Sequence, residues 1–346
     1  MKRNLLVSVI ITTYGNPNKL ERAINSALNQ TYGDIEVIVV DDNNPNTESR
    51  KKTEMVMTLY QSNMKVTYIK HDKNRNGAAA RNTGIDSANG TYIAFLDNDD
   101  IYTSERIEKS VYYLENNKTD AGVLTSVILT EDGVPVSAVT PEEGENLCYR
   151  LLEGKTSLGT GSNLFFRKEI VDDIGKFDVR FLRYQDLEYF LRVASKYKIG
   201  IISEKLIIKD SEPGKLVGYK KMKEMTILYL QKFEYLIAQM SVEDKNNCYS
   251  FHFSNLLEWA IQAGDKKGID EEYDILCKND LATEYHHLLY KKRIQKSYRF
   301  ALVRNLKKIW ITKTLLQLIR KFKIRLNSIK SFSNEDINTI RDLLGY

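Results

Sequence analysis

Blocks of apolar and polar residues take turns along the first hundred positions, and they predict strands and helices in alternation. Three short, mostly apolar runs are typical of strands buried on both faces of a sheet, at residues 5–12, 35–40 and 92–96, and residues 65–70 are expected to form a further short strand. Three segments between them have features of helices, at residues 20–28, 47–61 and 77–87. Asn18 can cap the first of these helices. This order predicts an open, mostly parallel α/β sheet flanked by helices, with right-handed crossovers.

The pattern changes beyond residue 100. We expect a strand pair at 122–129 and 134–139 and one further strand at 199–202. Helices are expected at 107–114, 165–174 and 187–195. From about residue 218 onward the signals are almost wholly helical, and 222–240 is the clearest of them. We therefore divide the chain into an α/β domain, 1–215, and a helical C-terminal region, 216–346.

Composition narrows the class of protein. The chain has 346 residues, of which 42% are hydrophobic and 28% are charged, as in an ordinary soluble globular protein. Its three cysteines are far apart and lack the spacing of a zinc site or a disulfide framework, which favours a reducing compartment. The apolar runs are too short for a membrane-spanning helix, and the first is interrupted before it could serve as a signal peptide. We therefore expect a cytoplasmic protein.

Charge is distributed unevenly, although the net charge is only +5. Residues 291–330 contain fourteen Lys and Arg and no Asp or Glu, so the rest of the chain is acidic. An acidic body with a basic tail does not suit a nucleic-acid binder. The tail is amphipathic, and two interpretations stay open. It rests on an anionic membrane, at the inner face of the cell membrane, or it packs on the body with its basic face solvated.

Unusual polar residues follow three of the predicted strands: Thr12 to Tyr14, Asp41 with Asp42, and Asp97 to Asp100. The carboxyl ends of parallel strands meet at one edge of a sheet, where open α/β sheets bind ligands. Because clustered carboxylates repel one another, a divalent metal ion that carries a phosphate-bearing ligand would explain the third group. Arg81, one turn into a predicted helix, adds positive potential to the same edge. Together these features describe a nucleoside-diphosphate site.

Four motifs in this order and spacing resemble the core of glycosyltransferase family 2: VSVIITTY, IEVIVVDDNN, NRNGAAARNTGID and TYIAFLDNDD. The resemblance covers roughly residues 5–215 and continues through 161–163, 175–178 and 184–187. It implies the GT-A fold, a Rossmann-like and mostly parallel sheet, here followed by a helical C-terminal appendage. It also implies an enzyme that moves a sugar from a nucleotide donor to an acceptor.

The resemblance implies roles at the nucleotide end of the site. Thr12 and Tyr14 correspond to residues that line a uracil pocket, and Asp42 to the carboxylate that reads the base. Asp41 is the alternative to Asp42. Arg81 corresponds to a basic residue near the pyrophosphate, although it could also be an ordinary arginine on the helix surface.

Other matching residues belong to the reacting end. Asp97 and Asn98 correspond to the start of the DxD motif on the ribose side, and Asp99 to the ligand of Mn²⁺ or Mg²⁺. Asp186 corresponds to the general base of inverting members, with Glu188 as a nearby competitor. Many members carry a further metal-binding histidine after the next strand. Here residues 207–211 contain none, so the last metal ligand stays open.

We therefore expect a metal-dependent, inverting glycosyltransferase of the hexosyltransferase class. The donor would be a UDP-sugar, with a dTDP-sugar as the alternative, and the acceptor a saccharide or lipid-linked saccharide in surface polysaccharide or glycolipid synthesis. Two other functions stay open. A sugar-nucleotide nucleotidyltransferase would need a glycine-rich phosphate loop, where residues 12–19 contain only Gly15. A membrane-associated nucleotide-binding scaffold would keep the sheet without a catalytic base.

Overall fold

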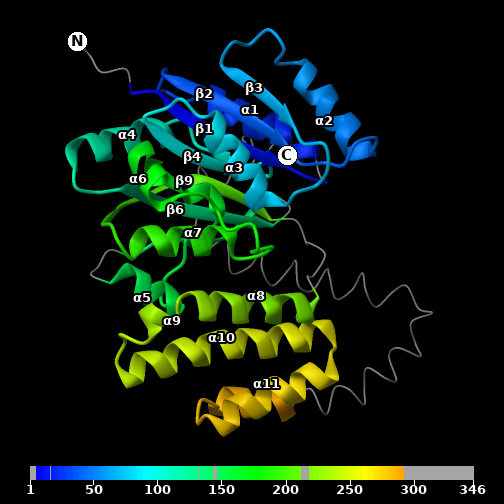
Figure 1. The fold of residues 1–346 in the computed structure, drawn as a ribbon, viewed down its shortest axis with the longest axis vertical. Coiled ribbons are helices and arrows are strands. Elements are labelled where there is room, and N and C mark those ends of the chain that lie inside the picture. The colour runs from blue at the N-terminus through cyan, green and yellow to red at the C-terminus, as the bar shows by residue number, and fades with distance from the viewer. Residues whose placement is uncertain (1–4, 16, 132, 143–145, 212–217, 292–346) are drawn as a thin grey trace. The chain divides into compact units, whose positions relative to one another are not determined.

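The computed structural model describes residues 5–15, 17–131, 133–142, 146–211 and 218–291. These residues form two compact units. One contains the described residues up to 148 and those at 156–211, and the other contains 149–155 with 218–291. The first unit carries the sheet and the second is helical (Figure 1). The basic tail proposed at 291–330 lies, apart from Lys291, outside the described residues.

One mixed, nine-stranded sheet forms the centre of the first unit within the described residues. Its order is β3-β2-β1-β4-β8-β6-β9-β5, and β7 pairs with β6 at the side. The strands are β1 Val7–Thr13, β2 Ile35–Asp41, β3 Val66–Lys70, β4 Tyr92–Asp97, β5 Asp100–Tyr102, β6 Gly122–Glu131, β7 Val134–Val139, β8 Phe165–Arg167 and β9 Ile199–Ser211. Strands β3, β2, β1 and β4 run parallel, and β6 is parallel to β9, whereas β7, β8 and β5 are antiparallel to their neighbours. The predicted α/β sheet, mostly parallel and flanked by helices, is therefore confirmed.

Helices surround the sheet and make up the second unit. In the sheet-bearing unit they are α1 Leu20–Leu28, α2 Glu48–Thr58, α3 Gly77–Ser87, α4 Arg106–Asn116, α6 Lys168–Ile174 and α7 Gln185–Ala194. Helix α5 Leu147–Leu152 begins in this unit, but its residues from 149 onward belong to the second. The second unit contains α8 Tyr219–Lys232, α9 Glu234–Ile237, α10 Val242–Ala263 and α11 Lys266–Lys278. None of the helices in the described ranges is both long enough and apolar enough to cross a bilayer.

Three local predictions were wrong. Residues 17–19 form a 3-10 turn, so Lys19 and not Asn18 is the N-cap residue of α1, and the side chain of Lys19 makes no capping hydrogen bond. The helix expected from residue 165 begins only at 168, because 165–167 pair with β4 and tertiary pairing overrides the local pattern. The strand expected at 199–202 continues to 211, since it pairs with β6 on one side and β5 on the other.

Alternate side chains of the central strands pack against helices on opposite faces of the sheet. Val37 and Val39 of β2 belong to the same buried cluster as Ile24 of α1. Ile38, between them in the sequence, instead packs with Ala80 of α3. Because both faces are covered by helices, the strands are apolar almost throughout, which explains why the sequence pattern predicted them.

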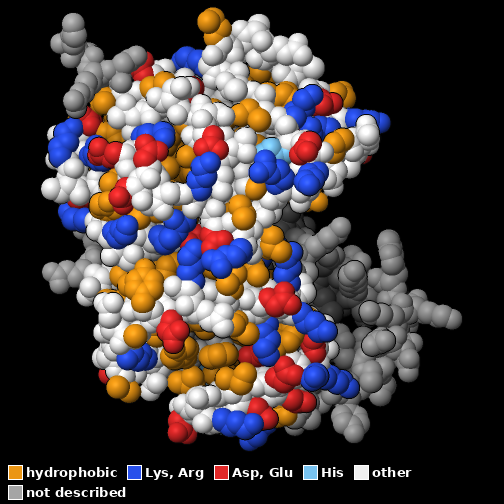
Figure 2. Space-filling view, in the orientation of Figure 1, with side chains coloured by type: hydrophobic (Ala, Val, Ile, Leu, Met, Phe, Trp, Pro, Cys, Tyr) orange, Lys and Arg blue, Asp and Glu red, His pale blue; other side chains and the backbone are white. Residues whose placement is uncertain are grey.

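Charged side chains of both signs are interspersed over the face of the sheet-bearing unit that Figure 2 shows. Within this unit, exposed pairs such as Lys176 with Asp86 and Lys168 with Asp172 join opposite charges directly. Pairs of this kind contribute little to stability individually, about 0–1 kcal/mol each. The stability of this unit therefore depends mainly on its buried sheet and helices.

Close packing of α3 on β1 gives a test of this arrangement. A Cβ atom at Gly84 would lie 2.3 Å from Cγ2 of Ile10, a stiff, buried side chain. Gly84→Ala should therefore lower the free energy of unfolding by about 1–3 kcal/mol, although alanine is intrinsically the better helix former. Gly33→Ala adds its methyl group to open space and serves as the control in the same urea titrations. Equal stability of the two variants would contradict the packing described here.

Candidate active site

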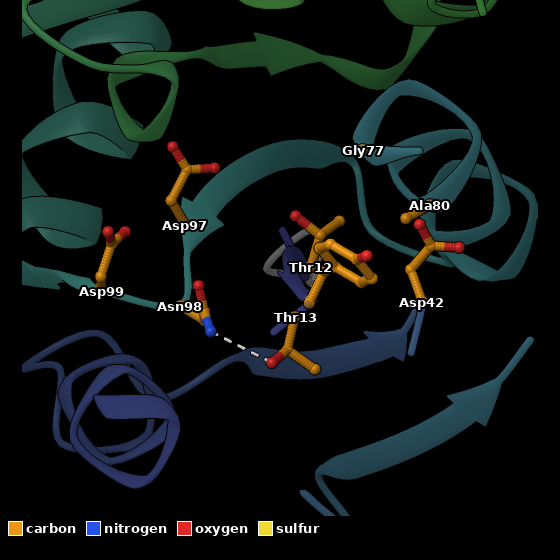
Figure 3. A pocket seen from close by; sticks show the side chains of 9 residues that line it. Thr12, Thr13, Asp42, Gly77, Ala80, Asp97, Asn98 and Asp99 are labelled. Atoms are coloured by element: carbon orange, nitrogen blue, oxygen red, sulfur yellow. Dashed lines mark hydrogen bonds between the residues drawn. The ribbon is translucent and has the colours of Figure 1, made fainter. Parts of the chain in front are cut away.

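A pocket of about 180 Å³ opens at the carboxyl ends of β1 and β4. Strand β1 has β2 on one side and β4 on the other, so the chain changes direction across the sheet at this point, where open α/β sheets bind ligands. Nine residues line the pocket: Thr12, Thr13, Tyr14, Asp42, Gly77, Ala80, Asp97, Asn98 and Asp99. In Figure 3, Asp42 lies at one end, Asp97 and Asp99 lie at the other, and Thr12 and Thr13 lie between them. The structure thus brings together the strand-end residues singled out in the sequence.

Asp42 is buried and held in place by polar neighbours. Its Oδ1 accepts hydrogen bonds from Nδ1 of His71 at 2.7 Å and from the backbone N–H of Arg75 at 2.8 Å. Its Oδ2 accepts one from Nδ2 of Asn74 at 2.7 Å. A carboxylate only accepts, so His71 carries its proton on Nδ1 and is fixed through Nε2 by the hydroxyl of Thr83. Sequence reasoning missed His71, because nothing in the local pattern connects it with a strand 29 residues earlier.

Asp41 and Asp42 have different environments. Asp41 is fully buried, pairs with Arg50 at 3.1 Å and accepts a hydrogen bond from the hydroxyl of Tyr68 at 2.7 Å. It does not line the pocket, whereas Asp42 does. Tyr14, at the end of β1, has an exposed ring, with 60% of its surface accessible. An exposed aromatic ring and an oriented carboxylate therefore both line the pocket.

The residues that follow β4 are held differently from one another. Oδ1 of Asp97 accepts a hydrogen bond from Arg81 at 2.6 Å, and the amide of Asn98 donates to the hydroxyl of Thr13 at 3.1 Å. Asp99 is exposed, and no other side chain of the described residues donates a hydrogen bond to its carboxylate. Its pKa is raised because the surrounding protein reduces the hydration of the carboxyl group and because Asp97 is close.

Asp100 points away from solvent. Burial, and then the charges of Asp99 and Asp97, raise its pKa to about 7. Its Oδ2 accepts hydrogen bonds from the hydroxyls of Thr160 at 2.5 Å and Ser162 at 2.6 Å. Asp100 thus anchors the segment 159–162 beneath the acidic end of the pocket, and its role is structural.

Arg81 and Asp186 lie beside the pocket. Arg81 is buried, and its guanidinium group donates to Asp97 and also to Oε1 of Gln185 at 2.8 Å. Gln185 begins α7 after Tyr184, whose φ of 61° lies in the left-handed region and turns the chain sharply. This turn places the half-buried Asp186 next to Gly161, where an added Cβ would be 3.4 Å from Cβ of Asp186 and from Oδ2 of Asp97.

Glu188, the competitor for the role of general base, is fully buried. Its carboxylate pairs with Arg192 at 2.6 Å, one turn further along α7. Asp186, by contrast, has no hydrogen bond or ion pair with any described residue. The structure therefore leaves Asp186, and not Glu188, with a carboxylate that can accept a proton.

The donor set suits a cation that arrives with its ligand. No group of three or more His, Cys, Asp or Glu side chains in the described part of the chain could by itself hold a metal ion. Asp99 offers one open carboxylate, and one oxygen of Asp97 is already held by Arg81. Mg²⁺ and similar ions commonly bind through one or two carboxylates together with substrate phosphates. The site therefore fits a divalent ion bound to a diphosphate.

Comparisons with known proteins agree with this geometry. The family model described as glycosyl transferase family 2 matches residues 8–175. An uncharacterized glycosyltransferase of Methanocaldococcus jannaschii is 34% identical over 206 residues, which are 58% of this chain and 69% of that protein. The amylovoran biosynthesis glycosyltransferase AmsB of Erwinia amylovora is 26% identical over 55% of this chain and 64% of its own length. The crystal structure of S. aureus TarS 1-349 in complex with UDP-GlcNAc matches with a TM-score of 0.52 at 17% identity, over 76% of this chain and 82% of that one. This last likeness shows the fold alone.

A charge cluster around the buried Asp210 of β9 gives a prediction with a defined dependence on pH. Burial works to raise the pKa of Asp210, but Lys19 at 2.9 Å and Arg22 at 2.7 Å outweigh it and hold that pKa below the ordinary 3.8. A depressed carboxyl pKa stabilises the fold above pH 3.8, and this contribution is lost as the pH falls through the native pKa. Asp210→Asn should therefore lower the free energy of unfolding at pH 7 by about 1–3 kcal/mol.

The difference between the wild type and Asp210→Asn should shrink steadily in denaturation experiments below pH 3.8. Asp86→Asn is the matched control, because Asp86 forms an exposed pair with Lys176 and should change stability by no more than about 1 kcal/mol. A loss for Asp210→Asn that stays constant down to the lowest pH would contradict the assignment.

Proposed function

The chain belongs to glycosyl transferase family 2 and is a glycosyltransferase, and from this premise we propose that it moves a sugar from a UDP-sugar to an acceptor hydroxyl with inversion. Family membership excludes the nucleotidyltransferase and the non-catalytic scaffold. One observation carries the proposal: the pocket has an oriented carboxylate, Asp42, at one end and the acidic pair Asp97 and Asp99 at the other, with the open carboxylate of Asp186 beside it.

The Asp42 end would bind the base. Each carboxylate oxygen can accept two hydrogen bonds, so Oδ2 of Asp42 keeps an acceptor position for the N–H of a pyrimidine after bonding Asn74. The exposed ring of Tyr14 offers a surface on which the base can stack, and Thr12, between the two ends of the pocket, would also contact the base. Uracil and thymine present the same N–H, so a dTDP-sugar is the alternative donor. The solved complexes of S. aureus TarS with UDP-GlcNAc and with UDP support uridine.

The other end would bind the ribose and the diphosphate. We place Asp97 and Asn98 on the ribose side, with Asp97 fixed by Arg81. Asp99 would hold the divalent cation, Mn²⁺ or Mg²⁺, and members of the family are typically metal-dependent. When bound, such a cation acts as a Lewis acid that offsets the negative charge developing on the leaving diphosphate.

Asp186 would act as the general base. The acceptor oxygen forms a bond to the anomeric carbon while the bond from that carbon to the diphosphate oxygen breaks. The hydroxyl proton passes to the carboxylate of Asp186, and UDP leaves with the electron pair. A single displacement of this kind inverts the configuration. The segment around Gly161, next to Asp186, would face the sugar.

For the acceptor we propose a saccharide or lipid-linked saccharide used in surface polysaccharide synthesis, on the cytoplasmic side of the membrane. The name of the relative AmsB, an amylovoran biosynthesis glycosyltransferase, supports a polysaccharide pathway. Binding of the basic segment 291–330 to anionic lipid stays a prediction.

A donor screen tests the proposal without an acceptor. We expect slow hydrolysis of a UDP-sugar, or of a dTDP-sugar, in the presence of Mn²⁺ or Mg²⁺, and its loss when EDTA is added. GDP-sugars serve as the comparison, because guanine is a larger, two-ring purine whose N–H donors are placed differently from the N–H that a pyrimidine would present to Asp42. The readout is release of the nucleoside diphosphate. If no UDP- or dTDP-sugar is hydrolysed or bound, the donor assignment is wrong.

Replacement of the proposed base separates catalysis from binding. Asp186→Asn should lower the transfer rate by about 10²–10⁴-fold, because the amide cannot take the proton. The affinity for UDP, measured by calorimetry, should change little. Asp172→Asn, on the exposed side of α6, is the control for an ordinary loss of an aspartate. Transfer by Asp186→Asn at the wild-type rate would remove this residue from the mechanism.

A further inference from the structure

Lys209, on β9, lies beside the acidic end of the pocket. In the antiparallel ladder between β5 and β9 it stands directly opposite Asp100. Directly opposed residues place their side chains on the same face of a sheet, and the next residue points to the other face. Lys209 therefore points with Asp100 toward the segment 159–162, whereas Asp210 points the other way and pairs with Arg22.

The segment 159–162 brings this lysine close to the reacting groups. Nζ of Lys209 donates a hydrogen bond to the carbonyl oxygen of Gly159 at 3.5 Å. Two residues later, a Cβ atom added to Gly161 would lie 3.4 Å from Oδ2 of Asp97 and from Cβ of Asp186, so the segment passes close to both side chains. The ammonium group therefore lies near the acidic end of the pocket, on a flexible four-carbon stem.

Lys209 is cationic at neutral pH and has donors to spare. Burial works to lower its pKa, but the carboxylates of Asp100, Asp97, Asp186 and Asp99 outweigh burial and raise it. Among the described residues its ammonium makes one hydrogen bond, to Gly159, and no direct ion pair. An ammonium group has three N–H donors, so two are left for a ligand. A lysine that served only to neutralise the acidic cluster would be expected to pair directly with one of its carboxylates.

We propose that Lys209 binds the diphosphate of the donor, so that a lysine and a divalent cation together offset the charge of the leaving group. The inference rests on the proposed nucleoside-diphosphate donor. It gives this site two sources of positive charge, one carried by the chain and one arriving with the ligand. It also predicts that the ammonium repels a divalent ion that comes without a diphosphate, because both would approach the same carboxylates.

Binding of uridine, UMP and UDP in EDTA provides the first test. Lys209→Met should weaken UDP binding by roughly 10- to 100-fold, the usual size of a charge-assisted contact, and leave uridine binding unchanged. Lys209→Arg keeps the charge and should retain most of the UDP affinity. Lys205→Met removes an exposed lysine from the same strand and is the matched control. Equal losses for uridine and UDP in Lys209→Met would show a merely structural role and overturn the proposal.

Binding of Mn²⁺ in the absence of nucleotide, measured by electron paramagnetic resonance, gives a second readout. In this experiment the variant should have the higher affinity, whereas its affinity for UDP should be lower. Lys209→Met should bind free Mn²⁺ more tightly than the wild type, because the competing ammonium is gone, even though it binds UDP less tightly. Unchanged UDP affinity in EDTA, or weaker Mn²⁺ binding by the variant, would also overturn the proposal. Failure of the proposed donor and failure of the proposed role of Lys209 give different results. Wild-type protein that binds no UDP even with metal refutes the donor, whereas wild-type binding that Lys209→Met leaves intact refutes only the role of Lys209.

Discussion

One side chain, Arg81, joins the parts of the site into a single arrangement. Its guanidinium group donates to Asp97 at the end of β4 and to Gln185 at the start of α7, from its own position on α3. Because the group is buried, removing either partner would leave part of its charge unsatisfied, which is costly. The pairing fixes Asp186, the next residue after Gln185, relative to Asp97. The distance between the nucleotide side of the pocket and the proposed base thus depends on this arginine, which the sequence suggested either as a neighbour of the pyrophosphate or as an ordinary arginine on the helix surface.

Charge compensation at this edge of the sheet is selective. Asp97 is paired with Arg81, and Asp210 is paired with Lys19 and Arg22. Asp100 accepts hydrogen bonds from two hydroxyl groups, and the pKa of its carboxyl group is raised. Asp99 and Asp186 are left without a hydrogen-bonding side chain among the described residues. These two are the carboxylates that the proposed chemistry needs open, one for a cation and one for a proton. Compensating every other carboxylate lowers the electrostatic cost of keeping these two ionised.

The local sequence pattern was enough to predict those features that depend only on residues close together in the chain. The strands and helices of the first hundred residues follow from short apolar runs, and α3 has the predicted bounds of Gly77–Ser87. The parallel strands then bring their carboxyl ends together, which is why the strand-end residues could be selected in advance. His71, Gln185 and Lys209 were not selected, because their relevance depends on contacts with residues 29 to about 109 positions away. The β-strand at 165–167 was missed for the same reason: its pairing with β4 is invisible in the sequence around it.

At three places around the site, two charged residues adjacent in the sequence have side chains in different environments: Asp41 and Asp42, Asp99 and Asp100, Lys209 and Asp210. In each pair one side chain is locked into the body of the protein and the other stands at or beside the pocket. For Lys209 and Asp210, both within β9, the alternation of side chains along extended backbone imposes this division, whereas Asp42 and Asp99 lie just beyond the ends of β2 and β4. A doubled charge at the end of a strand therefore supplies both a support and a ligand-facing group. A one-residue shift in the register between β5 and β9 would exchange Lys209 for Asp210 and replace the cation near the acidic end of the pocket with a further carboxylate, so the ladder itself determines the charge of the site.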